Sequence, residues 1–152
     1  MLFGSCGVLD DEKVKDHIII PVSAVRDEGT SYHYAAPSEE IEASKDAILV
    51  LQKVLETCGY SYVKGKTWTS DGIYRETLSA LKERREEGCL AVEMECAAML
   101  AVSQYRKIPF LQFLYGADNL SSEKWEIRDL TAYGLSCAEK YMLLAFECGL
   151  AL

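Results

Sequence analysis

The stretch Ala91-Val92-Glu93-Met94-Glu95-Cys96-Ala97-Ala98 decides the fold, because a short apolar segment gives way there to a helical pattern. A second apolar run, Ile108 to Tyr115, is followed by Gly116-Ala117-Asp118-Asn119. Acidic side chains therefore follow two candidate strands. The carboxyl ends of parallel strands lie along one edge of a sheet, where ligands bind. We expect a site at this edge for a polar small molecule that carries hydroxyl groups.

Strand-like and helix-like segments alternate over the rest of the chain. His17–Val25 is rich in β-branched residues, which favours a strand. A helix is expected from Ser44, which can cap it, to Cys58, because apolar residues recur there at helical spacing. The last helix is expected over Leu130–Leu150. This alternation, without an internal repeat or linker, predicts an α/β fold with residues 1–152 in a single domain.

The composition excludes several classes of partner. The 152 residues carry a net charge of −8, whereas nonspecific binding to nucleic acid or to an anionic membrane needs a basic surface. No apolar run approaches the length of a membrane-spanning helix, and no charged-then-apolar leader is present. The 6 cysteines lack metal-ligand spacing and suit a reducing compartment. We expect a cytoplasmic protein without a metal, which binds neither nucleic acid nor membrane.

The segment Gly4-Ser5-Cys6-Gly7 follows the apolar residues Met1-Leu2-Phe3 and is expected to form a turn after a buried strand. Such a turn exposes backbone N–H groups, and the serine hydroxyl adds a donor, so the segment can hold phosphate. The same pattern also suits a tight turn without a ligand. The chain starts abruptly here, as if the beginning of the strand were missing.

The acidic residues at the sheet edge each have two interpretations. In extended or irregular backbone, Glu93 and Glu95 face the same way and can accept hydrogen bonds from neighbouring sugar hydroxyls. They can equally be first-turn glutamates that interact with the dipole of the helix that follows. Asp118 can be a general acid if partial burial raises its pKa, or a turn residue beside Asn119. Trp125 has no assignable role and is expected to pack.

Five motifs, in this order, resemble the nucleoside phosphorylase superfamily, in particular the hexameric branch of purine nucleoside phosphorylases, uridine phosphorylases and related nucleosidases. They are Gly4–Gly7, Val25–Tyr34, Thr69–Tyr74, Val92–Glu95 and Ala117–Asn119. Val-Glu-Met-Glu is the most specific of them. The resemblance implies a three-layer α/β/α phosphorylase/hydrolase-like fold with a central mixed sheet.

The resemblance also implies roles at the sugar and the base. Glu95 would bind the ribose 2′- and 3′-hydroxyls, Met94 would pack on the sugar, and Glu93 would support the same region. Asp118 matches the acid that protonates the purine ring nitrogen in purine-specific members. Uridine-specific members use a glutamine and an arginine instead, and that pair is not clear here. The Gly-Thr-Ser-Tyr-His-Tyr loop, however, is closest to uridine phosphorylase-like members, so the base preference stays open.

The remaining implied contacts concern phosphate and the flanks of the base. Ser5, with the backbone around Cys6 and Gly7, would contact phosphate, and Ile73 and Tyr74 would flank the base. Inorganic phosphate would be a co-substrate, and no cofactor is expected. The implied reaction is phosphorolysis of a purine or pyrimidine nucleoside to free base and (deoxy)ribose 1-phosphate. The alternatives are a hydrolytic nucleosidase and an inactive homologue that only binds nucleoside.

The resemblance has one gap, because the family's chains extend well upstream of the Gly-Ser-Cys-Gly motif. The upstream part supplies the first strands, a Gly-rich phosphate loop and the phosphate-binding arginines. We therefore expect an N-terminally truncated domain, which could be a fragment, one half of a split enzyme or a degenerate homologue. An apolar face left bare by truncation would be covered by self-association, so a homo-oligomer is expected.

Overall fold

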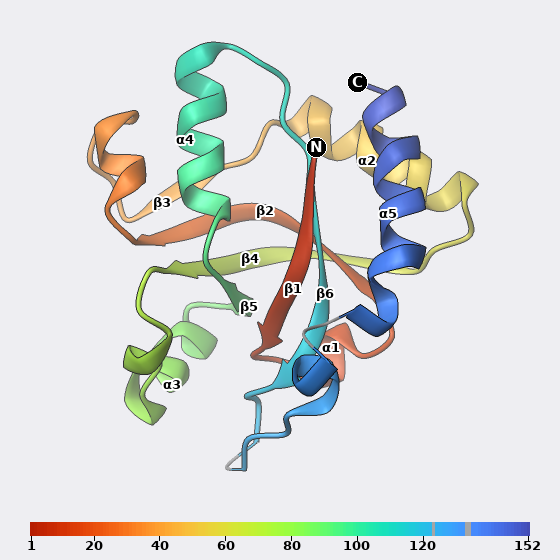
Figure 1. The fold of residues 1–152 in the computed structure, drawn as a ribbon. Coiled ribbons are helices and arrows are strands. Elements are labelled where there is room, and N and C mark those ends of the chain that lie inside the picture. The colour runs from red at the N-terminus through yellow and green to blue at the C-terminus, as the bar shows by residue number, and fades with distance from the viewer. Residues whose placement is uncertain (123, 133–134) are drawn as a thin grey trace.

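The computed structural model describes residues 1–122, 124–132 and 135–152. The described residues form one six-stranded sheet with the order β3-β2-β4-β5-β1-β6 (Figure 1). The strands are β1 (Leu2–Val8), β2 (Ile18–Asp27), β3 (Glu40–Glu42), β4 (Tyr62–Ser70), β5 (Cys89–Glu93) and β6 (Gln112–Asn119). The sheet is mixed, because β1 runs parallel to β6 but antiparallel to β5. This confirms the predicted α/β class with a central mixed sheet.

Helices cover both faces of this sheet. One face carries α2 (Lys45–Thr57), α4 (Cys96–Arg106) and α5 (Leu135–Leu150), and the other carries α1 (Asp11–Val14) and α3 (Leu78–Glu86) (Figure 1). Short 3-10 helices form at η1 (Thr30–His33), η2 (Ile73–Arg75) and η3 (Arg128–Ala132). The arrangement is therefore the three-layer one that the sequence predicted. None of the described helices is long and apolar enough to cross a membrane.

The local signals that begin and end the helices act as the sequence indicates. Ser44 caps α2 by accepting a hydrogen bond from the backbone N–H of Ala47, and the strand expected at His17–Val25 is β2. On the face of the sheet opposite α1 and α3, Leu51 and Leu55 of α2 are fully buried and belong to the same hydrophobic cluster as Phe113 of β6. Each such side chain contributes about 1.5–3 kcal/mol to stability.

The last helix begins later than predicted, because α5 starts at Leu135 while Leu130 lies in η3. Two further differences from the sequence prediction bear on the site. Gly4-Ser5-Cys6-Gly7 is not a turn: it lies inside β1, with an irregularity in the pairing to β6 between Cys6 and Gly7. The glycines suggested a turn, but Gly7 packs so closely that an added Cβ would lie 2.8 Å from Leu120 Cδ1 and 2.9 Å from Val92 Cγ1. Asp118 likewise lies within β6, which extends to Asn119, and not in a turn after it.

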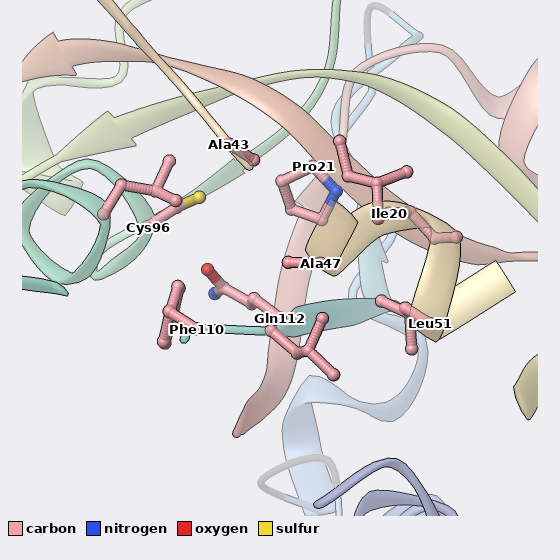
Figure 2. Close-up of a pocket in the computed structure, with 11 residues that line it drawn as sticks. Ile20, Pro21, Ala43, Ala47, Leu51, Cys96, Phe110 and Gln112 are labelled. Carbon is pink, nitrogen blue, oxygen red and sulfur yellow. The ribbon is translucent and has the colours of Figure 1, made fainter. Parts of the chain in front are cut away.

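A small cavity lies in the core between α2, α4 and β2, where Gln112 of β6 is one of the lining residues (Figure 2). Its volume is about 10 Å³, which suits at most one water molecule. Gln112 is buried, and its Oε1 has no hydrogen-bond partner among the described residues. The cavity is too small for an organic ligand, so the candidate site lies elsewhere.

Candidate active site

A cleft of about 220 Å³ opens where β5 and β6 end. Its walls come from β1, η2, the β5–α4 junction, β6 and η3, which are far apart in the sequence. The lining residues are Ser5, Cys6, Gly7, Ile73, Glu76, Val92, Glu93, Met94, Glu95, Ala117, Asp118, Leu120 and Leu130. The fold thus brings together every predicted site residue except Tyr74.

Glu93 ends β5 and fixes the wall that carries the next two residues. Its Oε2 accepts hydrogen bonds from the backbone N–H groups of Glu95 at 2.8 Å and Cys96 at 2.6 Å, which caps α4. Its Oε1 accepts a hydrogen bond from the Thr69 hydroxyl at 2.5 Å. The oxygen of that hydroxyl in turn accepts a hydrogen bond from the backbone N–H of Ala97 at 3.0 Å. Glu93 thus lines the cleft and also holds the start of α4, although it ends β5 and does not belong to the first turn of the helix.

The burial of Glu93 affects its charge. Only 4% of the residue is exposed, and this desolvation raises the pKa of its carboxyl. The hydrogen bonds from Thr69 and from the two backbone N–H groups act in the opposite direction, because they favour the ionised form. Both oxygens already have partners, so Glu93 serves the cleft mainly by holding its wall in place.

Met94 and Glu95 occupy the turn between β5 and α4 and present their side chains to the cleft. Both are exposed, with Met94 at 44%. No hydrogen bond or ion pair among the described residues occupies the Glu95 carboxylate. Glu95 therefore has free acceptor oxygens beside an apolar thioether, an arrangement suited to a ring that carries hydroxyl groups.

Asp118 faces the cleft from β6, where it pairs in register with Gly7 of β1. The indole Nε1–H of Trp125 donates to Asp118 Oδ2 at 2.7 Å. Burial raises the pKa of the Asp118 carboxyl, while the Trp125 hydrogen bond and the charge of Arg128 lower it. The net effect is a pKa above that of an exposed aspartate, which favours the protonated form of Asp118.

Trp125 was expected only to pack, and its role depends on a contact that the sequence does not mark. Backbone hydrogen bonds in both directions between Asn119 and Glu126 close the chain back on the end of β6. This bridge places the indole, which is 55% exposed, beside Asp118. The sequence alone does not reveal the pairing of Asp118 with Trp125, seven residues later, because it depends on this backbone bridge.

Glu76 is a second acid of the cleft that sequence reasoning missed. It follows η2, lines the cleft with Asp118, and is partly buried. No hydrogen bond or ion pair within the described ranges reaches its carboxylate. Burial, with a smaller effect of the Asp118 charge, raises the pKa of Glu76 to about 7. In the sequence it looks like the start of a charged helix, which hides this environment.

The β1 wall is neutral and closely packed. The Cys6 thiol is buried and donates a weak hydrogen bond to the Tyr115 carbonyl at 3.5 Å. Burial raises the pKa of this thiol, and the charges of Glu93 and Asp118 raise it further, so Cys6 is not a nucleophile here. Ser5 is exposed at the mouth of the cleft. The hydroxyl of Ser5 and the backbone of β1 are the groups that this wall can offer to an anion.

The two residues predicted to flank the base, Ile73 and Tyr74, differ in their position relative to the cleft. Ile73 of η2 lines the cleft and is 53% exposed, so it can provide an apolar surface. Tyr74 is 98% exposed and does not line the cleft. Leu120 and Leu130 add further apolar surface to the cleft.

The cleft is acidic. Four carboxyl groups line it, from Glu76, Glu93, Glu95 and Asp118, and none of the described lining residues is a lysine or an arginine. No group of three or more histidine, cysteine or acidic side chains in the described part of the chain could hold a metal ion. The arrangement can bind hydroxyl groups, pack a flat ring and exchange protons with it, but it offers an anion no positive side chain.

Comparison with known proteins agrees with this geometry. The sequence profile of the Phosphorylase superfamily matches residues 1–140. The chain belongs to this superfamily. It is 29% identical over 122 residues to a DeoD-type purine nucleoside phosphorylase of an Exiguobacterium species, covering 75% of this chain and 48% of that protein. A guanosine phosphorylase of Halorubrum lacusprofundi is 25% identical over 101 residues, covering 66% of this chain and 42% of that protein.

Solved structures share the fold of this phosphorylase-superfamily chain. An AMP nucleosidase from Bacteroides thetaiotaomicron superposes with a TM-score of 0.75 at 21% identity, covering 96% of this chain and 57% of that one. A purine nucleoside phosphorylase from Toxoplasma gondii gives a TM-score of 0.69 at 21% identity, covering 78% of this chain and 48% of that one. The chain spans about half the length of the relatives it matches.

Proposed function

We propose that this chain acts on purine nucleosides and cleaves the N-glycosidic bond by phosphorolysis, giving free base and (deoxy)ribose 1-phosphate. One observation carries the proposal: Glu95 with Met94, the β1 segment at Ser5 and the acid Asp118 line the same cleft. In the proposed complex, the sugar, the phosphate and the base would therefore lie next to one another. The superfamily match supports nucleoside chemistry.

The sugar end would act on the developing charge of the ribose. Cleavage of the C–N bond builds positive, oxocarbenium-like charge on the sugar ring. In the proposed complex, the Glu95 carboxylate accepts hydrogen bonds from the 2′- and 3′-hydroxyls and orients the ring, while Met94 packs on it. Glu93 keeps both residues in position through the capped start of α4. Carboxylates nearby also favour the positive charge as it forms.

The base end would stabilise the leaving group. Asp118 donates a proton to the base nitrogen as the bond breaks, which disperses the negative charge of the leaving base. Ile73 and Leu120 provide apolar flanks for the flat ring. Phosphate, held near Ser5, Cys6 and Gly7, then bonds to C1′. Neither a metal nor a cofactor takes part in these steps as proposed.

The preference for purines rests on two observations. The relatives named above are purine nucleoside and guanosine phosphorylases. The cleft also presents carboxyl groups at its base end, Asp118 and Glu76, instead of a glutamine and arginine pair. Carboxyl groups suit a base that must be protonated to leave.

Hydrolysis is the second candidate, because the described lining residues include no lysine or arginine to hold phosphate. Water needs no cationic partner, and the AMP nucleosidase from Bacteroides thetaiotaomicron shares the fold. In that case base and free ribose would be the products, and phosphate would have no effect on the rate.

The test is cleavage of inosine and uridine by the purified chain, with and without phosphate. We expect phosphate-dependent release of hypoxanthine, with uridine cleaved more slowly. Glu95→Gln and Asp118→Asn should each lower kcat/KM by about 10²-fold or more. Glu86→Gln, on the exposed side of α3, is the matched control. Activity of both site variants equal to that of the parent would refute the site, and equal rates without phosphate would establish hydrolysis.

The organisation of the protein is also proposed. The single sheet supports the view that residues 1–152 form one domain. The described cysteine thiols are free, which suits the reducing cytoplasm. Exposed Met142, Leu143 and Phe146 on α5 support a homo-oligomer, because exposed apolar side chains in a row favour association. Light scattering would test this, and a monomer at micromolar concentration would refute it.

A further inference from the structure

We propose that Glu76 is the proton-supplying residue of the cleft: it shares one proton with Asp118 and passes that proton through Asp118 to the leaving base. The inference rests on the proposed function and deepens it. It assigns the cleft to nucleosides whose neutral base must be protonated to leave, as distinct from those whose base is already cationic.

The geometry of the two acids carries this inference. Glu76 enters the cleft from the end of η2 and Asp118 enters it from β6, so they lie on different walls of one space. Asp118 has a fixed partner in the Trp125 indole, which favours its ionised form. No described residue forms a hydrogen bond or ion pair with the Glu76 carboxyl, which is free to carry a proton.

The charges around Glu76 point the same way. The groups that face the cleft from the surrounding elements are Asp118, Glu93, Glu95 and the neutral thiol of Cys6. The positive charge of Arg128 lowers the pKa of Asp118. Two carboxyl groups in one partly desolvated space cannot both ionise without cost, so a proton is retained between them. Burial and the Asp118 charge both raise the pKa of Glu76, so the proton resides there near neutral pH.

The proton balance is simple. The shared proton passes from Glu76 to Asp118, directly or through one water, and Asp118 gives it to the base nitrogen as the C1′–N bond breaks and its electron pair passes to that nitrogen. Glu76 then regains a proton from solvent. No oxidant, reductant or cofactor is needed. Glu76 acts through Asp118, so its loss should change the pH dependence of the reaction more than the binding of substrate.

The first test needs no turnover. Trp125 is hydrogen-bonded to Asp118, so its fluorescence should report protonation in the cleft. The Trp125→Phe variant retains only Trp68, the other of the two tryptophans, and its signal is the background to subtract. We expect a transition near pH 7 in the parent and in the control Glu86→Gln, and its loss in Glu76→Gln. An unchanged transition in Glu76→Gln would overturn the proposal.

The second test uses kinetics. With inosine, Glu76→Gln should lower kcat about 10-fold or more at pH 7, where the parent still carries the Glu76 proton, and the loss should shrink toward pH 5.5, where protons from solvent are more abundant. With 7-methylguanosine, whose base leaves without protonation, the variant should match the parent at both pH values. A uniform loss on both substrates would show a merely structural role and overturn the proposal. If the parent cleaves neither substrate, the proposed function fails, and the fluorescence titration still decides whether the proton is shared.

Discussion

The two ends of the cleft, to which we assign the sugar and the base of the proposed substrate, are built in different ways. At the sugar end, Glu93 is buried at the junction of β5 and α4, and each of its oxygens has a hydrogen-bond partner. At the base end, Ile73 lies in the short 3-10 helix η2 and Glu76 directly follows it, and Trp125 reaches Asp118 from a segment closed by one backbone bridge. One end is held by regular secondary structure and the other by connecting segments.

This difference has a functional meaning. Binding a ribose is common to all nucleosides, and a rigid wall can perform it for every substrate. The base varies, and residues on connecting segments can change without loss of the fold. We therefore expect substitutions at the sugar end to affect both stability and activity, and substitutions at the base end to affect activity, pH dependence and base preference.

The largest effect is expected for Glu93→Gln. The amide keeps the size of the side chain, but its NH2 group must face either the α4 N–H groups or the Thr69 hydroxyl, which already accepts a hydrogen bond from Ala97. Stability should fall by about 2 kcal/mol in urea unfolding, since a buried donor is left without an acceptor. Activity should fall about 10³-fold as the wall moves. Unchanged unfolding would contradict the capping role.

Glu95→Gln should separate binding from folding. Its carboxylate makes no hydrogen bond among the described residues and is exposed, so the free energy of unfolding should change by less than about 0.5 kcal/mol. Activity on any nucleoside should still fall about 10²-fold, because the ribose hydroxyls lose an ionised acceptor. Urea unfolding and inosine cleavage on the same preparation test this pair of outcomes. If Glu95→Gln lost stability and activity together, as Glu93→Gln is expected to do, the proposed difference between the structural role of Glu93 and the binding role of Glu95 would be wrong.

Trp125→Phe should lower activity at the base end by about 10-fold at neutral pH. The variant loses the indole N–H that orients Asp118 and favours its ionised form, so the pKa of that carboxyl should rise further. The pH optimum should move upward, which a pH–rate profile would detect. Trp68→Phe, at a tryptophan that donates to Asp27 outside the cleft, is the comparison variant. Identical profiles for parent and Trp125→Phe would rule out this role.

Glu76→Gln should stabilise the protein at high pH. Folding raises the pKa of Glu76 from 4.5 to about 7, so its contribution to stability is fully present below pH 4.5 and is lost as the pH rises through 7. Removal of the ionisable group should therefore stabilise the variant relative to the parent at pH 8. The gain should be about 1 kcal/mol after allowance for solvent screening, and it should shrink toward pH 5. Urea unfolding at both pH values measures it, and a gain that is equal at both would refute the assignment.

The smallest effect is expected for Tyr74→Ala. The side chain is 98% exposed and outside the cleft, so kcat/KM should stay within about 2-fold and stability within about 0.5 kcal/mol. Ile73→Ala, next to it but inside the cleft, should weaken substrate binding and raise KM. A large loss in Tyr74→Ala would show that the tyrosine reaches the base in the complex.

Much of this architecture could be predicted from the sequence, for a physical reason. The change from an apolar strand to a helical pattern at Val92-Glu93-Met94-Glu95 is local, so the residues themselves reveal it. The place of Asp118 near the end of the next strand is equally local, although β6 begins at Gln112 and continues through Asn119. Periodicity finds elements of this kind well and their ends less well.

The features that sequence reasoning missed depend on contacts between distant segments. Gly4–Gly7 has the composition of a turn, and only its two neighbours in the sheet make it a strand. Trp125 matters because a bridge returns the chain to the end of β6. Glu76 matters because its turn faces a second acid across the cleft. In each case the deciding partner lies outside any local window.

The place of β1 in the sheet has a consequence for synthesis of the chain. Residues 2–8 leave the ribosome before their strand neighbours, which are residues 89–93 and 112–119. Pairing over such a separation is slow and waits for the later segment to emerge. A nascent chain halted before residue 112 would therefore hold β1 without its parallel neighbour, so the wall of the cleft that carries Asp118 should form only after residues 112–119 have left the ribosome.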